Sequence, residues 1–240
     1  MPRAFAVLEV LAGSPEPMRL SAVALRLGLQ KSTSHRILQT LVGLGYVEQV
    51  QETGCYAAGL RLWELGEGIA TAHPVKRAAA GFMQDLHRTT GETVSLTILS
   101  GDDVLYLDKI ISPRPVRFTT RVGSRVPAVL TSGGKAILAY AADGAEIAGR
   151  SAGNLGGRRR TTVENVLEEL EEVRRNGYAT SSFNPGIVSF AAPVMSRDGQ
   201  AAAALSVSAP TERLSAAKRR EVIEAVRSAC AHMAERVGRL

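Results

Sequence analysis

In the first sixty positions, apolar and small residues recur at intervals of three and four, which is the spacing of one buried helical face. Three such sets predict three short helices: Ala4, Val7, Leu8, Leu11; Leu20, Val23, Ala24, Leu27; and Ser34, Ile37, Leu38, Leu41. The spacing then changes to alternation over residues 46–50, and Glu52-Thr53-Gly54 turns the chain into a second short strand. Three helices followed by a hairpin are typical of a winged helix-turn-helix.

The connection between the second and third helices is short, Gly28-Leu29-Gln30, as a helix-turn-helix requires. Gly28 is expected to end the second helix in the left-handed conformation, and Ser21 is expected to cap its start. We therefore assign residues 1–59 to a winged helix-turn-helix domain.

The rest of the chain mixes helical and strand patterns. A helical pattern over residues 59–72 is broken by His73-Pro74, so we assign residues 60–73 to a linker helix. In residues 74–240 we expect strands at 93–100, 104–110, 115–121, 187–196 and 200–208, and helices at 75–90, 131–140, 163–176 and 215–237. Helices around an antiparallel, hairpin-rich sheet indicate an α+β sensor domain.

Composition excludes several classes of protein. Hydrophobic residues make up 45% of the chain and charged residues 22%, which is typical of a folded globular protein. No apolar run approaches the roughly 18–20 residues of a membrane helix, and Glu9 interrupts the segment that a signal peptide would need, so we expect a cytoplasmic protein without membrane contact. With two cysteines and four histidines, we expect neither a metal site nor a cofactor.

The net charge of +6 lies wholly in residues 74–240, because the six basic residues before them are balanced by six acidic ones. The positions of the charged residues along the chain are more informative than the net charge. No acid interrupts the stretch between Glu16 and Glu48, which suits a polyanion. A second acid-free stretch, from Lys109 to Tyr140, fits either an anionic ligand or a solvated strand face; it carries Arg114, Arg117, Arg121, Arg125 and Lys135.

The third predicted helix has a polar face opposite its apolar one. Arginine and glutamine, here Arg36 and Gln39, make bidentate contacts with guanine and adenine edges in the major groove. Residues at a helix start suit phosphate contacts. The predicted DNA-contacting residues are Lys31, Ser32, Thr33, His35, Arg36, Gln39 and Thr40. The alternative is an ordinary solvated helix in a module that binds a ligand or a protein instead of DNA.

Several motifs together resemble the IclR-type transcriptional regulators. They include Leu27-Gly28-Leu29-Gln30-Lys31-Ser32-Thr33-Ser34-His35-Arg36, Gly91-Glu92-Thr93-Val94, Gly134-Lys135-Ala136 and Leu205-Ser206-Val207-Ser208. The resemblance implies a winged-helix domain, a linker helix and a GAF-like effector domain. It also implies a homodimer or homotetramer on palindromic double-stranded operators, with a small organic effector, often a carboxylate or an aromatic. A repressor is expected, with an activator as the alternative.

The resemblance also implies the effector site. Ser206 and Ser208 match paired strand serines, and residues two apart on a strand share a face, so both can point into one pocket. Ser181 stands where some relatives hold the ligand with an acid. The remaining matched positions are Ser132 and Gly133 on a ligand-binding loop, and Ser189 where many members carry cysteine. The candidates for the apolar wall or its neighbours are Pro127, Val129, Leu130 and Phe190.

An enzyme is not expected. A Walker A phosphate loop around Gly134-Lys135 would need glycine at position 129 and serine or threonine at 136, where Val129 and Ala136 stand. A nucleophile elbow of the hydrolase type is not expected either. Four glutamates at positions 168–172 share one predicted helix with Arg174 and Arg175, which indicates a solvated face instead of paired catalytic acids.

Overall fold

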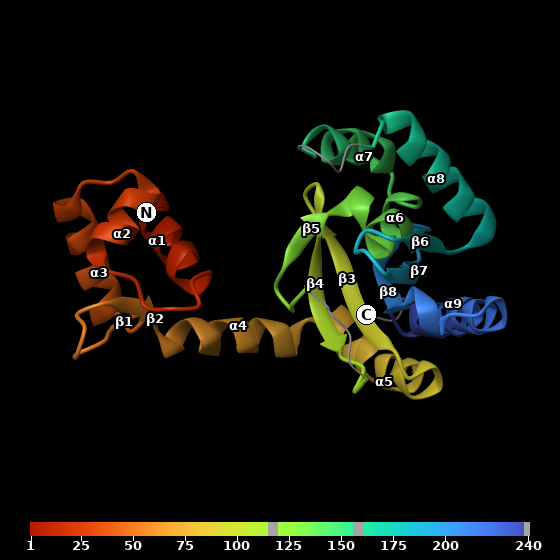
Figure 1. The fold of residues 1–240 in the computed structure, drawn as a ribbon, viewed down its shortest axis with the longest axis horizontal. Coiled ribbons are helices and arrows are strands. Elements are labelled where there is room, and N and C mark those ends of the chain that lie inside the picture. The colour runs from red at the N-terminus through yellow and green to blue at the C-terminus, as the bar shows by residue number, and fades with distance from the viewer. Residues whose placement is uncertain (115–119, 156–160, 238–240) are drawn as a thin grey trace. The chain divides into compact units, whose positions relative to one another are not determined.

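The computed structural model describes residues 1–114, 120–155 and 161–237. The chain divides into two compact units, Met1–Ala72 and His73–Leu240 (Figure 1). Each unit buries a hydrophobic core of its own. Among the helices of the described residues, none combines the length and the apolar content needed to span a bilayer.

The N-terminal unit is a three-helix bundle with a short hairpin, as its sequence predicts. Its elements are α1 (Pro2–Ala12), α2 (Leu20–Leu27), α3 (Lys31–Gly43), β1 (Val47–Gln49), β2 (Tyr56–Ala58) and α4 (Leu60–Ala72). All three bundle helices and both strands supply core residues: Val7, Leu11, Val23, Leu38, Leu41, Val47 and Tyr56. The apolar periodicities therefore become one shared core.

The two ends of α2 differ in how well the sequence predicted them. Gly28 ends the helix with φ 62°, the left-handed conformation that was expected. The prediction that Ser21 caps the start is wrong: α2 begins at Leu20 after Arg19, and among the described residues no side chain caps it. Met18 pairs with Tyr56 through two backbone hydrogen bonds of 2.8 Å, so the chain stays extended up to Arg19.

The C-terminal unit is built on one antiparallel sheet of six strands, in the order β5-β4-β3-β8-β7-β6. The strands are β3 (Thr93–Ser100), β4 (Asp103–Ile110), β5 (Arg125–Pro127), β6 (Ala179–Ser181), β7 (Ile187–Met195) and β8 (Ala201–Pro210). The helices are α5 (Pro74–Thr90), η1 (Ala128–Leu130), α6 (Ser132–Leu138), α7 (Gly144–Gly153), α8 (Val163–Asn176), η3 (Thr211–Arg213) and α9 (Ala216–Val237). The predicted α+β class is confirmed.

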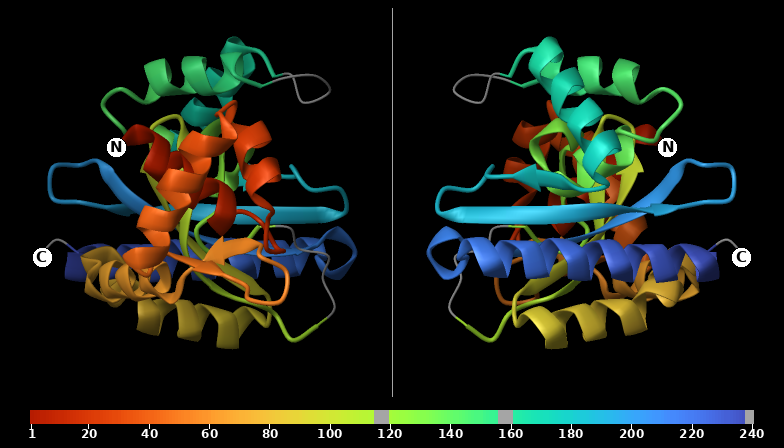
Figure 2. Two further views of the ribbon diagram at one scale, coloured as in Figure 1. Left: turned by 90° about the vertical axis from the view of Figure 1, so that its left-hand side faces the viewer. Right: turned by 90° about the vertical axis from the view of Figure 1, so that its right-hand side faces the viewer.

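Two layers of helices cover this sheet. Helices α5 and α9 lie on one face, and α6, α7 and α8 on the other (Figure 2). Because side chains alternate along a strand, Leu205 and Val207 of β8 enter the core under α5 and α9, while Ala204 enters the core under α6 and α8. Ser206 and Ser208 therefore share the α6 face.

Three parts of the C-terminal prediction need revision. Most of the strand expected at 115–121 lies outside the described residues, while Thr120 and Arg121 are not in a strand; β5 begins four residues after Arg121 and pairs with β4. The segment Gly144–Gly153 is a helix that periodicity did not reveal, since it carries three glycines and few apolar residues. Strand β6 also went unpredicted, because three residues are too few to show alternation.

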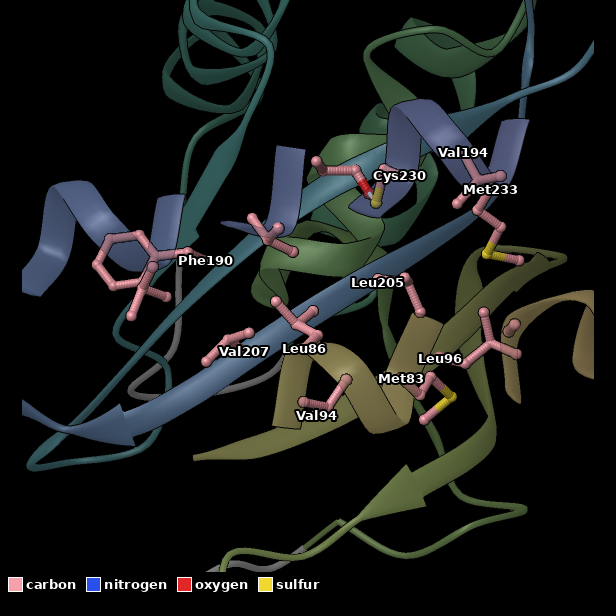
Figure 3. Close-up of a cluster of buried hydrophobic side chains, with 14 of the residues drawn as sticks. Met83, Leu86, Val94, Leu96, Phe190, Val194, Leu205, Val207, Cys230 and Met233 are labelled. Atoms are coloured by element: carbon pink, nitrogen blue, oxygen red, sulfur yellow. Dashed lines mark hydrogen bonds between the residues drawn. The ribbon is translucent and has the colours of Figure 1, made fainter. Parts of the chain in front are cut away.

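Cys230 lies deep in the core between α9 and the sheet, 1% exposed, among the side chains that Figure 3 shows. Its Sγ donates to the carbonyl of Ala192 at 3.2 Å, and burial raises the pKa of the thiol from 9.0 to about 12. The thiolate that attacks disulfide reagents is therefore not formed near pH 8.

We expect a disulfide reagent at pH 8 to modify one thiol of the native chain, Cys55, and to reach Cys230 only on unfolding. Cys55 lies between the strands of the hairpin and is only partly buried. Counting released thiolate by absorbance measures this, and Cys55→Ser should leave no fast reaction. The raised pKa of Cys230 also makes stability depend on pH. Because the native state holds the proton more tightly than the unfolded state, the free energy of unfolding falls as pH rises above 9. Fast reaction of two thiols in the native protein would contradict the buried position of Cys230.

Candidate functional site

The polar stripe predicted on the third helix faces outward on α3. Ser34, Leu38 and Leu41 point into the core of the N-terminal unit, so the opposite side of the helix remains in solvent. Of the seven predicted DNA-contacting residues, Thr33 is half-buried and the others are exposed: Lys31, Ser32, His35, Arg36, Gln39 and Thr40. The hairpin does not cover them.

The side chain of Arg36 is unrestrained within this stripe. Its guanidinium has no ion pair or hydrogen bond with the described residues, although its carbonyl accepts from Thr40 Oγ1 at 2.9 Å. Gln39 differs, because its Nε2 donates to the hydroxyl of Tyr56 at 3.4 Å, which directs it toward β2. Arg36 is therefore free to make the planar, two-bond contact with a base edge that its fork allows.

The hairpin between β1 and β2 carries no lysine or arginine between Val47 and Ala58. Instead it exposes Glu48 and Glu52. Arg19 and Arg26 of the acid-free stretch are exposed at the start of α2 and in its last turn. Within the N-terminal unit, the positive charge that attracts phosphates is thus concentrated on α2 and α3 and not on the hairpin of β1 and β2.

A cavity of about 30 Å³ lies on the α6 face of the sheet in the C-terminal unit. Five of the six predicted effector-binding residues line it, brought together from α6, β6, β7 and β8. These five are Ser132, Ser181, Ser189, Ser206 and Ser208. Tyr106, Leu130, Thr131, Phe183, Asn184 and Ile187 complete the wall.

Serine hydroxyls join the elements around this cavity. Ser132 Oγ donates to Ser189 Oγ at 2.9 Å and ties the start of α6 to β7. Ser189 Oγ donates to the Ser181 carbonyl at 3.4 Å, and Ser181 Oγ donates to the Leu130 carbonyl at 2.6 Å. The start of α6 is held by Thr131, whose Oγ1 accepts from the amide of Gly134 at 2.9 Å.

Gly133 is the one predicted effector residue that is not among the residues lining the cavity. A Cβ at this position would lie 2.5 Å from Thr97 Oγ1 on β3. Glycine is therefore required because α6 packs closely on the sheet, which is a structural reason separate from ligand contact.

Of the four residues predicted for the apolar wall or its neighbours, only Leu130 lines the cavity. Phe190 lies on the opposite face, in the core under α9, because it follows Ser189 directly and adjacent strand residues point to opposite faces. Val129 is buried in the core under α7 and α8, and Pro127 does not reach the cavity. Phe183 and Ile187 supply the apolar contacts that were expected from these residues.

Among the described residues, no charged side chain lines the cavity. Arg114 lies 3.6 Å from Glu92, Arg125 donates to Ser100 at 3.0 and 2.9 Å, and Arg117 lies outside the described residues. Burial raises the pKa of the Tyr106 phenol above its ordinary value, so this group stays neutral. An anionic ligand, one of the two alternatives for the second acid-free stretch, thus finds no cationic partner among the described residues that line the cavity.

The Gly134-Lys135 pair serves packing and not phosphate binding. Lys135 Nζ lies 2.7 Å from Glu169 of α8 and donates to the Thr180 carbonyl of β6 at 3.2 Å. The lysine therefore joins α6 to both neighbouring elements. Glu171 pairs with Arg174 in solvent, as expected, but Glu169 is half-buried against α6 and Arg174 Nε donates to the Ala139 carbonyl at 2.6 Å, so the face is only partly solvated.

A winged helix-turn-helix with an exposed polar third helix, joined to an antiparallel C-terminal unit, defines the class of helix-turn-helix transcriptional regulators. The chain belongs to the IclR family of that class. The model of the IclR helix-turn-helix domain matches residues 2–51, and the model of the bacterial transcriptional regulator IclR C-terminal domain matches residues 68–235. The chain is a regulator of this family and not an enzyme.

Individual relatives agree with this assignment. The glycerol operon regulatory protein of Streptomyces griseus is 34% identical over 241 residues, covering 98% of this chain and 95% of that protein. The regulator KdgR of Escherichia coli K12 is 32% identical over 246 residues, covering 98% and 91%. An IclR homologue from Microbacterium hydrocarbonoxydans, solved with 4-hydroxybenzoate, superposes with a TM-score of 0.85 at 25% identity, covering 99% and 98%.

Proposed function

We propose that this protein binds a palindromic operator through α3 and represses transcription there, and that a small organic effector in the serine-lined cavity changes its affinity for that operator. In this proposal residues 1–59 bind DNA, residues 60–73 link the units and residues 74–240 bind the effector, with the chain acting in the cytoplasm. The observation that carries the proposal is the exposed stripe of α3 with the unpaired Arg36 guanidinium. The repressor assignment follows the family, whose members are mostly repressors.

Effector binding is supported by the arrangement of the cavity and by one relative. The five serines come from four separate elements, and most of the residues that line the cavity are polar. The homologue from Microbacterium hydrocarbonoxydans was solved in complex with 4-hydroxybenzoate. These two findings support a binding role for Ser132, Ser181, Ser189, Ser206 and Ser208. The proposal also keeps Gly133, which follows Ser132 at the start of α6.

A homodimer, or a homotetramer made from two dimers, is supported by the surface of the N-terminal unit. Helix α4 has no buried residue in the described chain, although Trp63 is 65% exposed and Ile69 is 70% exposed. Phe5 of α1 is 60% exposed as well. Apolar surface of this kind is covered in most soluble proteins, and a second copy would cover it while doubling the number of recognition helices.

Regulation then requires that the effector favour one arrangement of the two DNA-binding units. Recognition helices reach both half-sites only when they are about 34 Å apart along the duplex, or a multiple of this. A ligand with equal affinity for both arrangements would change nothing, so the effector has to bind one arrangement more tightly.

Footprinting on the DNA upstream of the protein's own gene tests the proposal. We expect two protected half-sites whose centres are separated by one helical turn or a multiple. Scrambling one half-site should weaken binding on the order of 100-fold, because the second contact, which is intramolecular once the first has formed, is lost. Equal affinity for scrambled and native DNA at the same salt concentration would indicate charge attraction alone. No DNA binding at all would favour the alternative, an interaction module.

A further inference from the structure

We propose that the effector of the serine-lined cavity is a small, uncharged molecule with several hydroxyl groups, a polyol, and that Ser95 contributes to its binding site. This inference rests on the proposed function, because it takes the cavity as the effector site. It replaces the carboxylate or aromatic effector that the family resemblance implies with a ligand that donates hydrogen bonds as well as accepting them.

The hydrogen bonds around the cavity show why a donor is needed. A hydroxyl group has one proton to donate and two lone pairs that accept. Five of the lining hydroxyls already donate to other protein oxygens, over 2.6–3.5 Å: Thr131, Ser132, Ser181, Ser189 and Ser206. What these five groups still offer to a ligand is lone pairs.

Three other lining side chains carry donors of their own. Tyr106 has a neutral phenol that shares a hydrogen bond with Thr120, Asn184 has an amide, and the hydroxyl of Ser208 makes no hydrogen bond with the described residues. The cavity therefore offers many acceptors and a few donors. An alcohol group, which both donates and accepts, matches that set at each position.

A carboxylate ligand fits this set of donors and acceptors poorly. An ionised carboxylate only accepts, so it would face the lone pairs of the five hydroxyls that donate elsewhere. No charged side chain among the described lining residues would compensate for moving it out of water. An ammonium group would find no carboxylate there either. The cavity therefore favours an uncharged ligand that can donate hydrogen bonds.

Ser95 adds a second, independent observation. It is 1% exposed, and its Oγ is buried without a hydrogen-bond partner among the described residues. Ser95 of β3 pairs directly with Ser206 of β8, and residues opposite each other in an antiparallel pair project from the same face. The unsatisfied hydroxyl therefore lies on the face of the sheet that forms the cavity floor, where a ligand hydroxyl can satisfy it.

The size of the cavity also favours a small ligand. About 30 Å³ is room for one or two water molecules, so even a short polyol requires the wall to move. The segment between β6 and β7, with Phe183 and Asn184, has no helix or strand and is the part of the wall with the least regular structure.

Isothermal titration of the full chain with matched pairs tests the ligand class. Each pair keeps one carbon skeleton and differs in charge: glycerol and glycerate, erythritol and erythronate, glucitol and gluconate. We expect one neutral member to bind at least about tenfold more tightly than its acid. If the acid binds more tightly in every pair, or no neutral member binds, the polyol assignment is overturned.

Ser95→Ala then tests the additional residue against a matched control. We expect it to weaken polyol binding about 2- to 12-fold while raising the Tm of the free protein, because it removes an unsatisfied buried hydroxyl. Ser151→Ala is the control, since Ser151 of α7 is equally buried and equally unpartnered but, unlike Ser95, does not lie on a strand beside a residue that lines the cavity. It should raise the Tm and leave polyol binding unchanged. Unchanged polyol binding in Ser95→Ala would overturn the role of Ser95.

Ser189→Ala separates failure of this inference from failure of the proposed function. If an acid binds and Ser189→Ala weakens it, the cavity is the effector site and only the polyol class is wrong. If a ligand binds and neither Ser189→Ala nor Ser208→Ala changes its affinity, the effector binds elsewhere and both proposals fail.

Discussion

Replacing Arg36 by alanine is expected to weaken operator binding by about 1–3 kcal/mol for each bidentate base contact that is lost. Arg36 is exposed, its guanidinium has no partner among the described residues, and it lies opposite the buried face of α3. The substitution therefore removes a contact to DNA without disturbing the core. Fluorescence anisotropy with labelled operator at one fixed salt concentration measures the loss, and thermal unfolding should be unchanged.

Two variants separate base recognition from simple charge. Lys31→Ala, at the start of α3, should weaken binding to operator and to unrelated DNA alike and should reduce the salt dependence of binding. Arg175→Ala removes the same charge as Arg36→Ala from an exposed position on α8 and should leave DNA binding unchanged. If Arg36→Ala and Arg175→Ala behave alike, the assigned recognition face is wrong.

Gly134→Ala is expected to destabilise the C-terminal unit by about 3 kcal/mol or more, at the upper end of what overpacking costs. A Cβ on Gly134 would lie 2.1 Å from the carbonyl oxygen of Ala128 and 2.6 Å from its carbon. These are backbone atoms of η1, so they cannot rotate aside as a side chain could. Urea unfolding followed by circular dichroism should show the C-terminal transition at lower denaturant.

The matched control is Gly149→Ala. Gly149 also lies in a helix, α7, but no atom lies within 4 Å of the position its Cβ would take. Because alanine is the better helix former, stability should stay the same or rise by about 0.5–1 kcal/mol. A Gly134→Ala variant as stable as Gly149→Ala would mean that α6 does not pack against η1 as described.

Local sequence signals predicted the regular elements where those signals were strong. Helix α8 has the predicted bounds, since its apolar face repeats clearly, Thr162 caps its start and Gly177 ends it with φ 74°. Helix α7 and strand β6 were missed, because glycines weaken the helical signal of the first and three residues cannot show a period of two. The start of α2 was misplaced because the pairing of Met18 with Tyr56 comes from β2, more than thirty residues away.

The sequence alone determined which side of α3 faces water, because the periodicity of one helix suffices to separate its buried and exposed sides. It also determined that Ser206 and Ser208 share a face of their strand. Only the tertiary structure decided what surrounds those serines: that Phe190 points away, that Gly133 is needed against Thr97, and that no charge among the described residues lines the cavity. The physical reason is that periodicity acts within one element, whereas the cavity forms where elements distant in the chain pack against each other.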